Sequence, residues 1–139
     1  MTTTRKQARE AFKQLLIDEN VIGSSKVLLG KHDNVDAKKL PVIHVRPAGG
    51  SYERSSVDSY EDTFNLTIEV EVRKTLTRDV DTALEDYEEA IIDAIRTGSA
   101  TLNALLLDYQ VINSGYTFEG EGKDQIGNAS ITVEAMLKP

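Results

Sequence analysis

Apolar and polar residues alternate most regularly from Thr63 to Arg73, where every second side chain is apolar. A two-residue period predicts a strand with one buried face and one solvated face, and strict alternation favours an antiparallel sheet. Residues 129–137 repeat this pattern and predict a second long strand. Shorter apolar runs predict three further strands, at 27–29, 42–45 and 109–112.

Two other segments repeat their apolar residues every three to four positions, which is the period of an amphipathic helix. The first predicted helix spans residues 4–20, and its apolar side contains Ala8, Ala11, Phe12, Leu15 and Leu16. The second spans residues 79–97, where Asp79 can cap the helix and Gly98 can end it. A short third helix is predicted at 100–107.

Polar segments separate these elements. Residues 46–62 contain Pro47, two glycines and four serines, and they predict a long exposed loop. Residues 115–127 predict a mobile turn or hairpin tip. The simplest packing of the elements is an α+β fold, with a mainly antiparallel sheet of about four to five strands and the two main helices on one face. We expect one domain over residues 1–139.

Composition agrees with an ordinary folded domain, because 40% of the 139 residues are apolar and 28% are charged. The absence of cysteine excludes disulfides, thiolate zinc sites and a cysteine nucleophile. The first residues hold no apolar run typical of a signal peptide, and no stretch is long enough to span a bilayer. We therefore expect a soluble cytoplasmic protein with no membrane partner.

The formal net charge of -7 disfavours binding to phosphate backbones, so no direct nucleic-acid partner is expected. The charge is unevenly distributed. Residues 1–46 hold nine Lys/Arg and five Asp/Glu (+4), whereas residues 47–139 hold seven and eighteen (-11). This asymmetry can steer the basic side of one copy onto the acidic side of another. An accidental bias of a solvated surface explains it equally well.

Residues that would indicate catalysis or metal binding are not arranged in a recognisable way. The two histidines, His32 in a polar segment and His44 in a strand, are interpreted as surface or structural residues. The acidic run at 85–89 falls mainly on the polar side of its helix and predicts a solvated face. We therefore predict no catalytic residues, no metal site and no cofactor.

Sequence motifs for bound ions, phosphates or a nucleophile also fail on their spacing. Asp79 and Asp81 resemble the start of a calcium loop, but Leu84 and Ala90 occupy the positions that need glycine and glutamate. Gly122 and Lys123 lack the other residues of a phosphate-binding loop. The serines lack the setting of a nucleophile elbow, so the chain is predicted not to be an enzyme.

Three segments of the sequence resemble the lambda-type phage tail terminator proteins, also called the minor tail protein U family. They are Leu40–Val45, Gly49–Glu53 and Thr63–Val70. The similarity continues through the second helix, the 102–107 segment, residues 114–116 and the closing strand, so it covers residues 5–137. None of these segments is a chemical signature.

The resemblance implies a structural bacteriophage protein with an α+β fold and without catalytic residues. Family members form homo-hexameric rings that cap the tail tube, stop its polymerisation and provide the surface that joins the head. The implied partners are other copies of the chain, the major tail tube protein and a head-completion or connector protein, with no small-molecule substrate. The implied location is the head-proximal end of the virion tail, after assembly in the host cytoplasm.

A closed ring needs two different patches on each subunit. We predict that the 46–62 segment supplies one, with two tyrosines as aromatic anchors. Its predicted contact residues are Arg46, Tyr52, Glu53, Arg54, Asp58, Tyr60, Glu61 and Asp62. The second predicted interface consists of Lys6, Arg9, Lys38, Lys39, Glu119, Glu121, Lys123 and Asp124. Basic residues of the first third would then face acidic residues of the 53–62 segment in the next subunit. Alternatively, the tyrosines only cover the sheet edge.

Two other functions stay open. A head-completion or head–tail connector protein also forms rings from small α+β subunits, and the sequence separates it poorly from a terminator. An acidic secretion-type chaperone belongs to a different class and would form a dimer. An enzyme is a more distant alternative, because the sequence offers no matched nucleophile and base.

Overall fold

The computed structural model describes residues 3–29, 40–54, 60–75, 79–122 and 125–138. Within these ranges the chain forms three α-helices, five strands and one short 3₁₀ helix. In chain order they are α1 (Arg5–Asp18), a 3₁₀ helix (Ser24–Lys26), β1 (Val27–Leu29), β2 (Val42–Arg54), β3 (Tyr60–Arg73), α2 (Val80–Thr97), α3 (Ala100–Leu105), β4 (Leu106–Glu119) and β5 (Ile126–Leu137).

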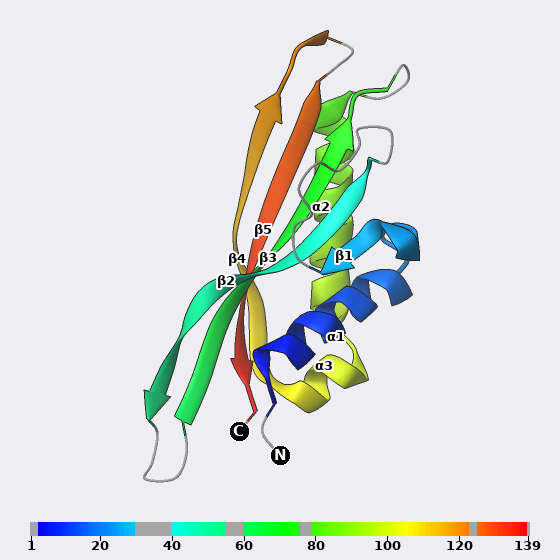
Figure 1. The fold of residues 1–139 in the computed structure, drawn as a ribbon. Coiled ribbons are helices and arrows are strands. Elements are labelled where there is room, and N and C mark those ends of the chain that lie inside the picture. The colour runs from blue at the N-terminus through cyan, green and yellow to red at the C-terminus, as the bar shows by residue number, and fades with distance from the viewer. Residues whose placement is uncertain (1–2, 30–39, 55–59, 76–78, 123–124, 139) are drawn as a thin grey trace.

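The five strands form one sheet in the order β1-β2-β3-β5-β4 (Figure 1). Every neighbouring pair is antiparallel except β1 and β2, which are parallel. The predicted α+β class, with two main helices packed on a mostly antiparallel sheet, is confirmed. Parallel neighbours cannot be joined by a tight hairpin turn, and twelve residues separate the end of β1 from the start of β2.

Strands β3 and β5 supply the sheet's largest share of the core, as their alternation predicts. Phe64, Leu66 and Ile68 of β3 are opposite Ala135, Val133 and Ile131 of β5, and all six side chains are buried. Because side chains alternate across a pleated sheet, these residues share one face. That face is the one that the helices cover.

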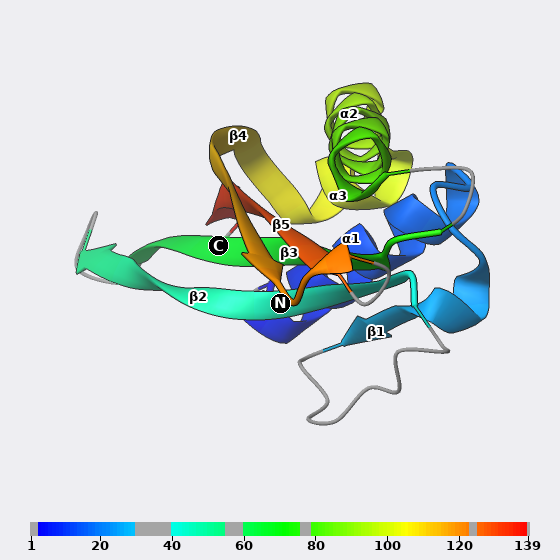
Figure 2. The ribbon, with the colours of Figure 1, turned by 90° about the horizontal axis from the view of Figure 1, so that it is seen from above.

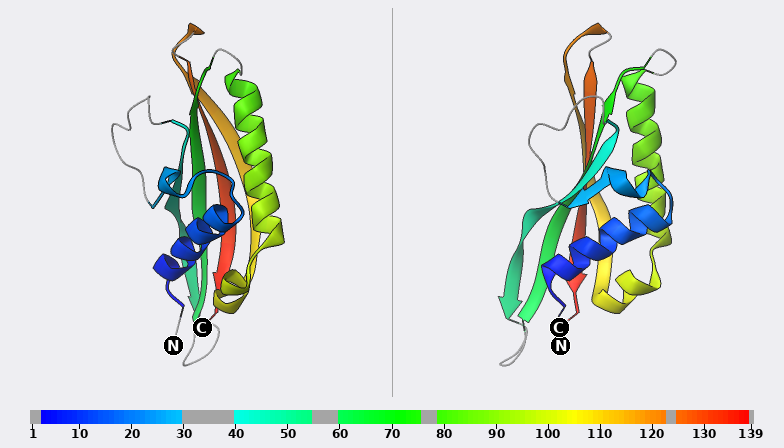
Figure 3. Two further views of the ribbon diagram at one scale, coloured as in Figure 1. Left: turned by 90° about the vertical axis from the view of Figure 1, so that its right-hand side faces the viewer. Right: turned by 45° about the vertical axis from the view of Figure 1, so that its right-hand side comes forward.

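Helices α1 and α2 lie on the same side of the sheet, as Figure 3 shows from the helical side and Figure 2 from above. Helix α1 packs against β1 and β2, whereas α2 packs against β3, β5 and β4. The Thr4 side chain and Gln7 form a capping box at the start of α1, and Asp79 accepts a hydrogen bond from the Thr82 amide at the start of α2. Gly98 ends α2 with a positive φ of 67°.

An aromatic pair fastens β4 to α1. The rings of Phe12 and Tyr109 meet edge to face with centroids 5.7 Å apart. The Tyr109 hydroxyl donates to Asn103 of α3 at 3.5 Å, and partial burial raises the pKa of this hydroxyl above its ordinary value.

The predicted loop at 46–62 is wrong for its described residues, because β2 continues to Arg54 and β3 begins at Tyr60. These two ends pair and project away from the helices (Figure 1). The side chains from Pro47 to Ser51 are exposed. Exposed strand residues such as Pro47 to Ser51 need no apolar alternation, and a bulge between Pro47 and Gly49 also shifts the register. The sequence pattern therefore could not reveal these strand residues.

The predicted strand at 109–112 is too short, and the turn predicted at 115–127 is correspondingly too long. Strand β4 runs from Leu106 to Glu119 and β5 starts at Ile126. Most of β4 is exposed, and its register with β5 shifts twice, between Leu106 and Asp108 and between Val111 and Asn113. Each bulge changes which face the following side chains occupy, so no regular alternation remains. The third helix ends at Leu105 rather than at 107.

Gly127 of β5 provides a test of how closely α2 packs on the sheet. A Cβ atom at this position would collide with Val80 and Leu84 of α2. We expect Gly127→Ala to lower the free energy of unfolding by about 1–3 kcal/mol, because the helix must move away from the strand. Urea denaturation measures this loss. Gly115→Ala is the matched control, since a Cβ there meets no atom within 4 Å. Equal stability of the two variants would contradict this packing.

Candidate subunit-binding surfaces

The first predicted interface lies on the hairpin formed by β2 and β3. In its register, Tyr52 is opposite Asp62, Glu53 opposite Glu61, and Arg54 opposite Tyr60. The hairpin thus brings the two predicted tyrosine anchors and their charged neighbours to its far end. The side chains of residues 52–54, 60 and 61 are outside the described part of the structure, as is all of Asp58.

Two charged residues of this predicted interface have partners within the same chain. The Asp62 carboxylate is 2.7 Å from Arg5 Nη2 and also accepts a hydrogen bond from Arg5 Nε at 2.9 Å. Arg5 lies over the Phe64 ring, 5.7 Å from its centroid. Arg46 Nε is 3.3 Å from Glu69 Oε2. These pairs tie the base of the hairpin to α1 and to the centre of the sheet.

The residues of the second predicted interface lie on separate elements. Lys6 is exposed and Arg9 is half-buried on α1, whereas Glu119 ends β4 and Glu121 follows it, both exposed. These two groups belong to separate elements, and no described contact brings them together. Lys38, Lys39, Lys123 and Asp124 lie outside the described residues.

The sheet face opposite the helices carries a polar cluster that spans β2, β3 and β5. His44 is fully buried, and its Nε2 atom is 3.6 Å from Glu71 Oε1. Glu69, only 6% exposed, accepts a hydrogen bond from Asn128 Nδ2 at 3.1 Å and pairs with Arg46. The sequence predicted a structural role for His44 but not this cluster, because His44 and Glu69 become neighbours only through the strand register.

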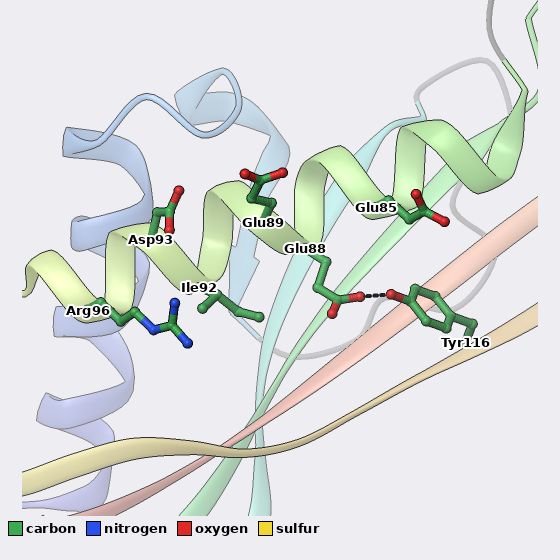
Figure 4. A pocket seen from close by; sticks show the side chains of 7 residues that line it. All are labelled: Glu85, Glu88, Glu89, Ile92, Asp93, Arg96 and Tyr116. Carbon is green, nitrogen blue, oxygen red and sulfur yellow. Dashed lines mark hydrogen bonds between the residues drawn. The ribbon is translucent and has the colours of Figure 1, made fainter.

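A shallow groove of about 330 Å³ lies between α2 and β4 (Figure 4). Its lining is mostly acidic and comprises Glu85, Glu88, Glu89, Ile92, Asp93, Arg96 and Tyr116. The Tyr116 hydroxyl donates a hydrogen bond to Glu88, and Ser114 Oγ lies 3.5 Å from the same carboxylate. Four carboxylates against one guanidinium favour a basic side chain as the occupant.

The acidic run on α2 is solvated as predicted at Glu85, Asp86 and Glu89, which are exposed. Glu88 differs, since it is half-buried and holds Tyr116. Sequence periodicity could not predict this contact, because β4 was not recognised as a strand at residue 116.

Strand β4 exposes four large apolar side chains, which are Leu107, Ile112, Tyr116 and Phe118. Their exposed fractions lie between 44% and 57%, and two of them, Leu107 and Ile112, lie at the register shifts of this strand. Single exposed apolar residues are common, but four along one edge strand suggest a surface that a protein partner covers. In the described residues, no group of His, Asp and Glu side chains is arranged to hold a metal ion.

Across the described ranges, none of the helices combines the length and apolar character needed to cross a membrane. No protein-family model and no curated protein matches the chain. Among solved structures, the fold is shared with a chain described as "Virion of native gene transfer agent (GTA) particle". The TM-score is 0.58 with 12% identity, and the match covers 94% of each chain. At this identity, the likeness establishes a common α+β fold.

Proposed function

We propose that this chain is a structural subunit of a phage-like particle, and specifically a tail terminator that forms a hexameric ring. The ring would cap the tail tube, stop its polymerisation and provide the surface that joins the head. The observation that carries this proposal is the fold shared with a chain of a gene transfer agent virion over 94% of both chains. The resemblance of three sequence segments to tail terminators adds the particular role.

The surfaces of the described residues support binding to proteins rather than catalysis. They present a projecting hairpin, an edge strand with exposed apolar side chains and an acidic groove. Aromatic side chains are enriched in protein–protein interfaces, and an acidic groove complements a basic partner surface. The proposed partners are other copies of the chain, the tail tube protein and a head-completion or connector protein.

Electron microscopy of particles assembled without this protein tests the role. A missing terminator leaves tube growth unchecked, so we expect tails that exceed the normal length and carry no heads. Normal tails beside separate heads would instead identify a connector, which is the second candidate. Restoring the gene on a plasmid should return the tail length distribution to normal.

The tips of β2 and β3 are proposed as one contact within the ring. Replacing both tyrosines, Tyr52→Ala with Tyr60→Ala, should weaken association by about 2 kcal/mol or more, a roughly 30-fold rise in the dissociation constant. Light scattering across a dilution series measures the change. The pair Tyr52→Phe with Tyr60→Phe keeps the aromatic area and should still form rings. If the double alanine variant associates as strongly as the unmodified protein, the tyrosines do not contribute to the interface.

Charge reversal on the hairpin separates the proposed charge pairing from internal stability. Glu61→Lys should lower the oligomer mass at physiological salt, because it would repel basic residues of the next subunit. Asp62→Lys is a poorer probe, since it also breaks the contact with Arg5. If Glu61→Lys leaves the mass unchanged while the protein stays folded by circular dichroism, the pairing is wrong.

A further inference from the structure

Two edges of the sheet remain open in the part of the chain that the structure describes. Strand β4 pairs with β5 on one side only, along its whole length. Strand β2 is covered by β1 only at Ile43 to Val45, so from Arg46 to Arg54 its described neighbour is β3 alone. An unpaired edge presents amide and carbonyl groups that can accept another strand.

The two open edges lie at the same level of the sheet. Following the register across the strands, Pro47 of β2 is opposite Leu66, which is opposite Val133, which is opposite Val111 of β4. Ser51 corresponds in the same way to Asp108. A second copy placed beside the first without sliding along the strands would therefore align residues 47–51 with residues 108–111.

Strand direction also suits such an addition. The long strands β2, β3, β5 and β4 alternate in direction, so β2 and β4 run opposite to each other. A neighbouring copy in the same orientation would thus place its β2 antiparallel to β4 of the first copy. Antiparallel addition is the more stable kind of pairing and continues the pattern of the sheet.

The helices beside the two edges carry opposite charges. Helix α2, which packs on β4, has six acidic residues and one basic residue. Helix α1, which packs on β1 and β2, has four basic and two acidic residues. Placing the β2 edge of one copy against the β4 edge of another brings α1 towards α2 of its neighbour. Lys6 and Lys13 are the two lysines of α1, and Glu85 and Glu89 are exposed acidic residues of α2, so these four residues test whether the two helices meet.

We propose that copies of this chain join head to tail by adding the outer half of β2 from one subunit to β4 of the next, which makes one continuous sheet. The contact covers the exposed apolar side chains of Leu107 and Ile112 and sets the acidic groove against the basic side of α1. Because the two surfaces differ, the contact generates a ring when the rotation closes. This inference deepens the proposed function, on which it rests, by naming the surfaces that build the ring.

Two features weigh against strand addition, because bulges and prolines often protect an edge from pairing. They are the bulges in β4 and Pro47 in β2, which has no N–H to donate. The bulges leave Leu107 and Ile112 at 57% and 46% exposure, whereas protective edges usually carry charged side chains. A facing bulge at Ala48 lies in β2 at nearly the level of Ile112. Irregular positions on the two edges therefore meet each other.

Engineered disulfides test this contact directly, because the chain contains no cysteine. Two double variants place cysteines at exposed positions that would face each other across the contact. One is Ala48→Cys with Ile112→Cys. The other, three residues further along β2, is Ser51→Cys with Leu107→Cys. Within one subunit β3 and β5 separate these positions, so a disulfide between them can form only between copies. After mild oxidation with oxidised glutathione at the highest soluble concentration, we expect a ladder of dimers, trimers and larger species on denaturing gels.

The controls distinguish this contact from other pairings. Each single cysteine can give at most a dimer, and Ala48→Cys with Asp81→Cys pairs the β2 edge with an exposed residue at the start of α2. Both should show background cross-linking. A strong dimer from Ile112→Cys alone would mean that two β4 edges pair about a two-fold axis, which overturns the proposal. The absence of a ladder from both double variants overturns it as well.

Exchanging the charges on α1 and α2 provides a second test of the contact. In the Ala48→Cys with Ile112→Cys background, Glu85→Lys with Glu89→Lys should cut the ladder yield about fivefold at low salt. Adding Lys6→Glu with Lys13→Glu should restore it. If these added changes do not restore the ladder, α1 and α2 of neighbouring subunits do not make the proposed contact. Six-fold rings without a disulfide ladder would contradict this interface and leave the terminator function intact, whereas normal tail length in particles lacking the protein would contradict the function itself.

Discussion

One-sided burial of the sheet is the constraint on which the rest of the structure depends. The apolar faces of β3 and β5 are covered by α1 and α2, and this burial supplies most of the core. Helix α2 packs mainly on the β4 side of this face and α1 mainly on the β1–β2 side, while Phe12 of α1 also reaches Tyr109 of β4. The acidic helix therefore belongs to the β4 edge and the basic helix to the β1–β2 edge.

Elements outside this core are free to serve contacts with other proteins. The ends of β2 and β3 near Arg54 and Tyr60 project beyond the helices, and β4 exposes apolar side chains that the core does not bury. The ion pair between Arg5 and Asp62 and the Arg46–Glu69 pair hold the base of the hairpin in a defined position. A rigid body with projecting ribbons and unlike edges is suited to repeated, directional assembly.

The sequence predicted the parts of the fold that burial controls. The alternation in β3 and β5 and the helical periods of α1 and α2 follow from contact with the core, so these elements were predicted within a few residues. The residues from Pro47 to Ser51 and from Asn113 to Glu119 are exposed strand, and solvent imposes no pattern on them. Their pairing depends on backbone hydrogen bonds to distant residues, which no local pattern reveals.

The candidate surfaces were predicted only in part for the same reason. The sequence predicts residues 46–62 as a contact region from their tyrosines and charges, but it predicts a loop where the structure has the paired ends of β2 and β3. The α2–β4 groove was missed because Glu88 and Tyr116 are 28 positions apart in sequence and meet only through the fold. Likewise, the sequence pattern could not predict that Arg46 pairs with Glu69 or that Asp62 pairs with Arg5.

Sedimentation equilibrium of the unmodified protein over a wide concentration range tests the central claim that this fold is built to bind copies of itself. We expect a concentration-dependent rise from the 15.3 kDa chain towards a closed species of about 92 kDa, which is six copies. A mass that remains at 15.3 kDa at every concentration, together with no sedimentation alongside purified tail tubes, would contradict it.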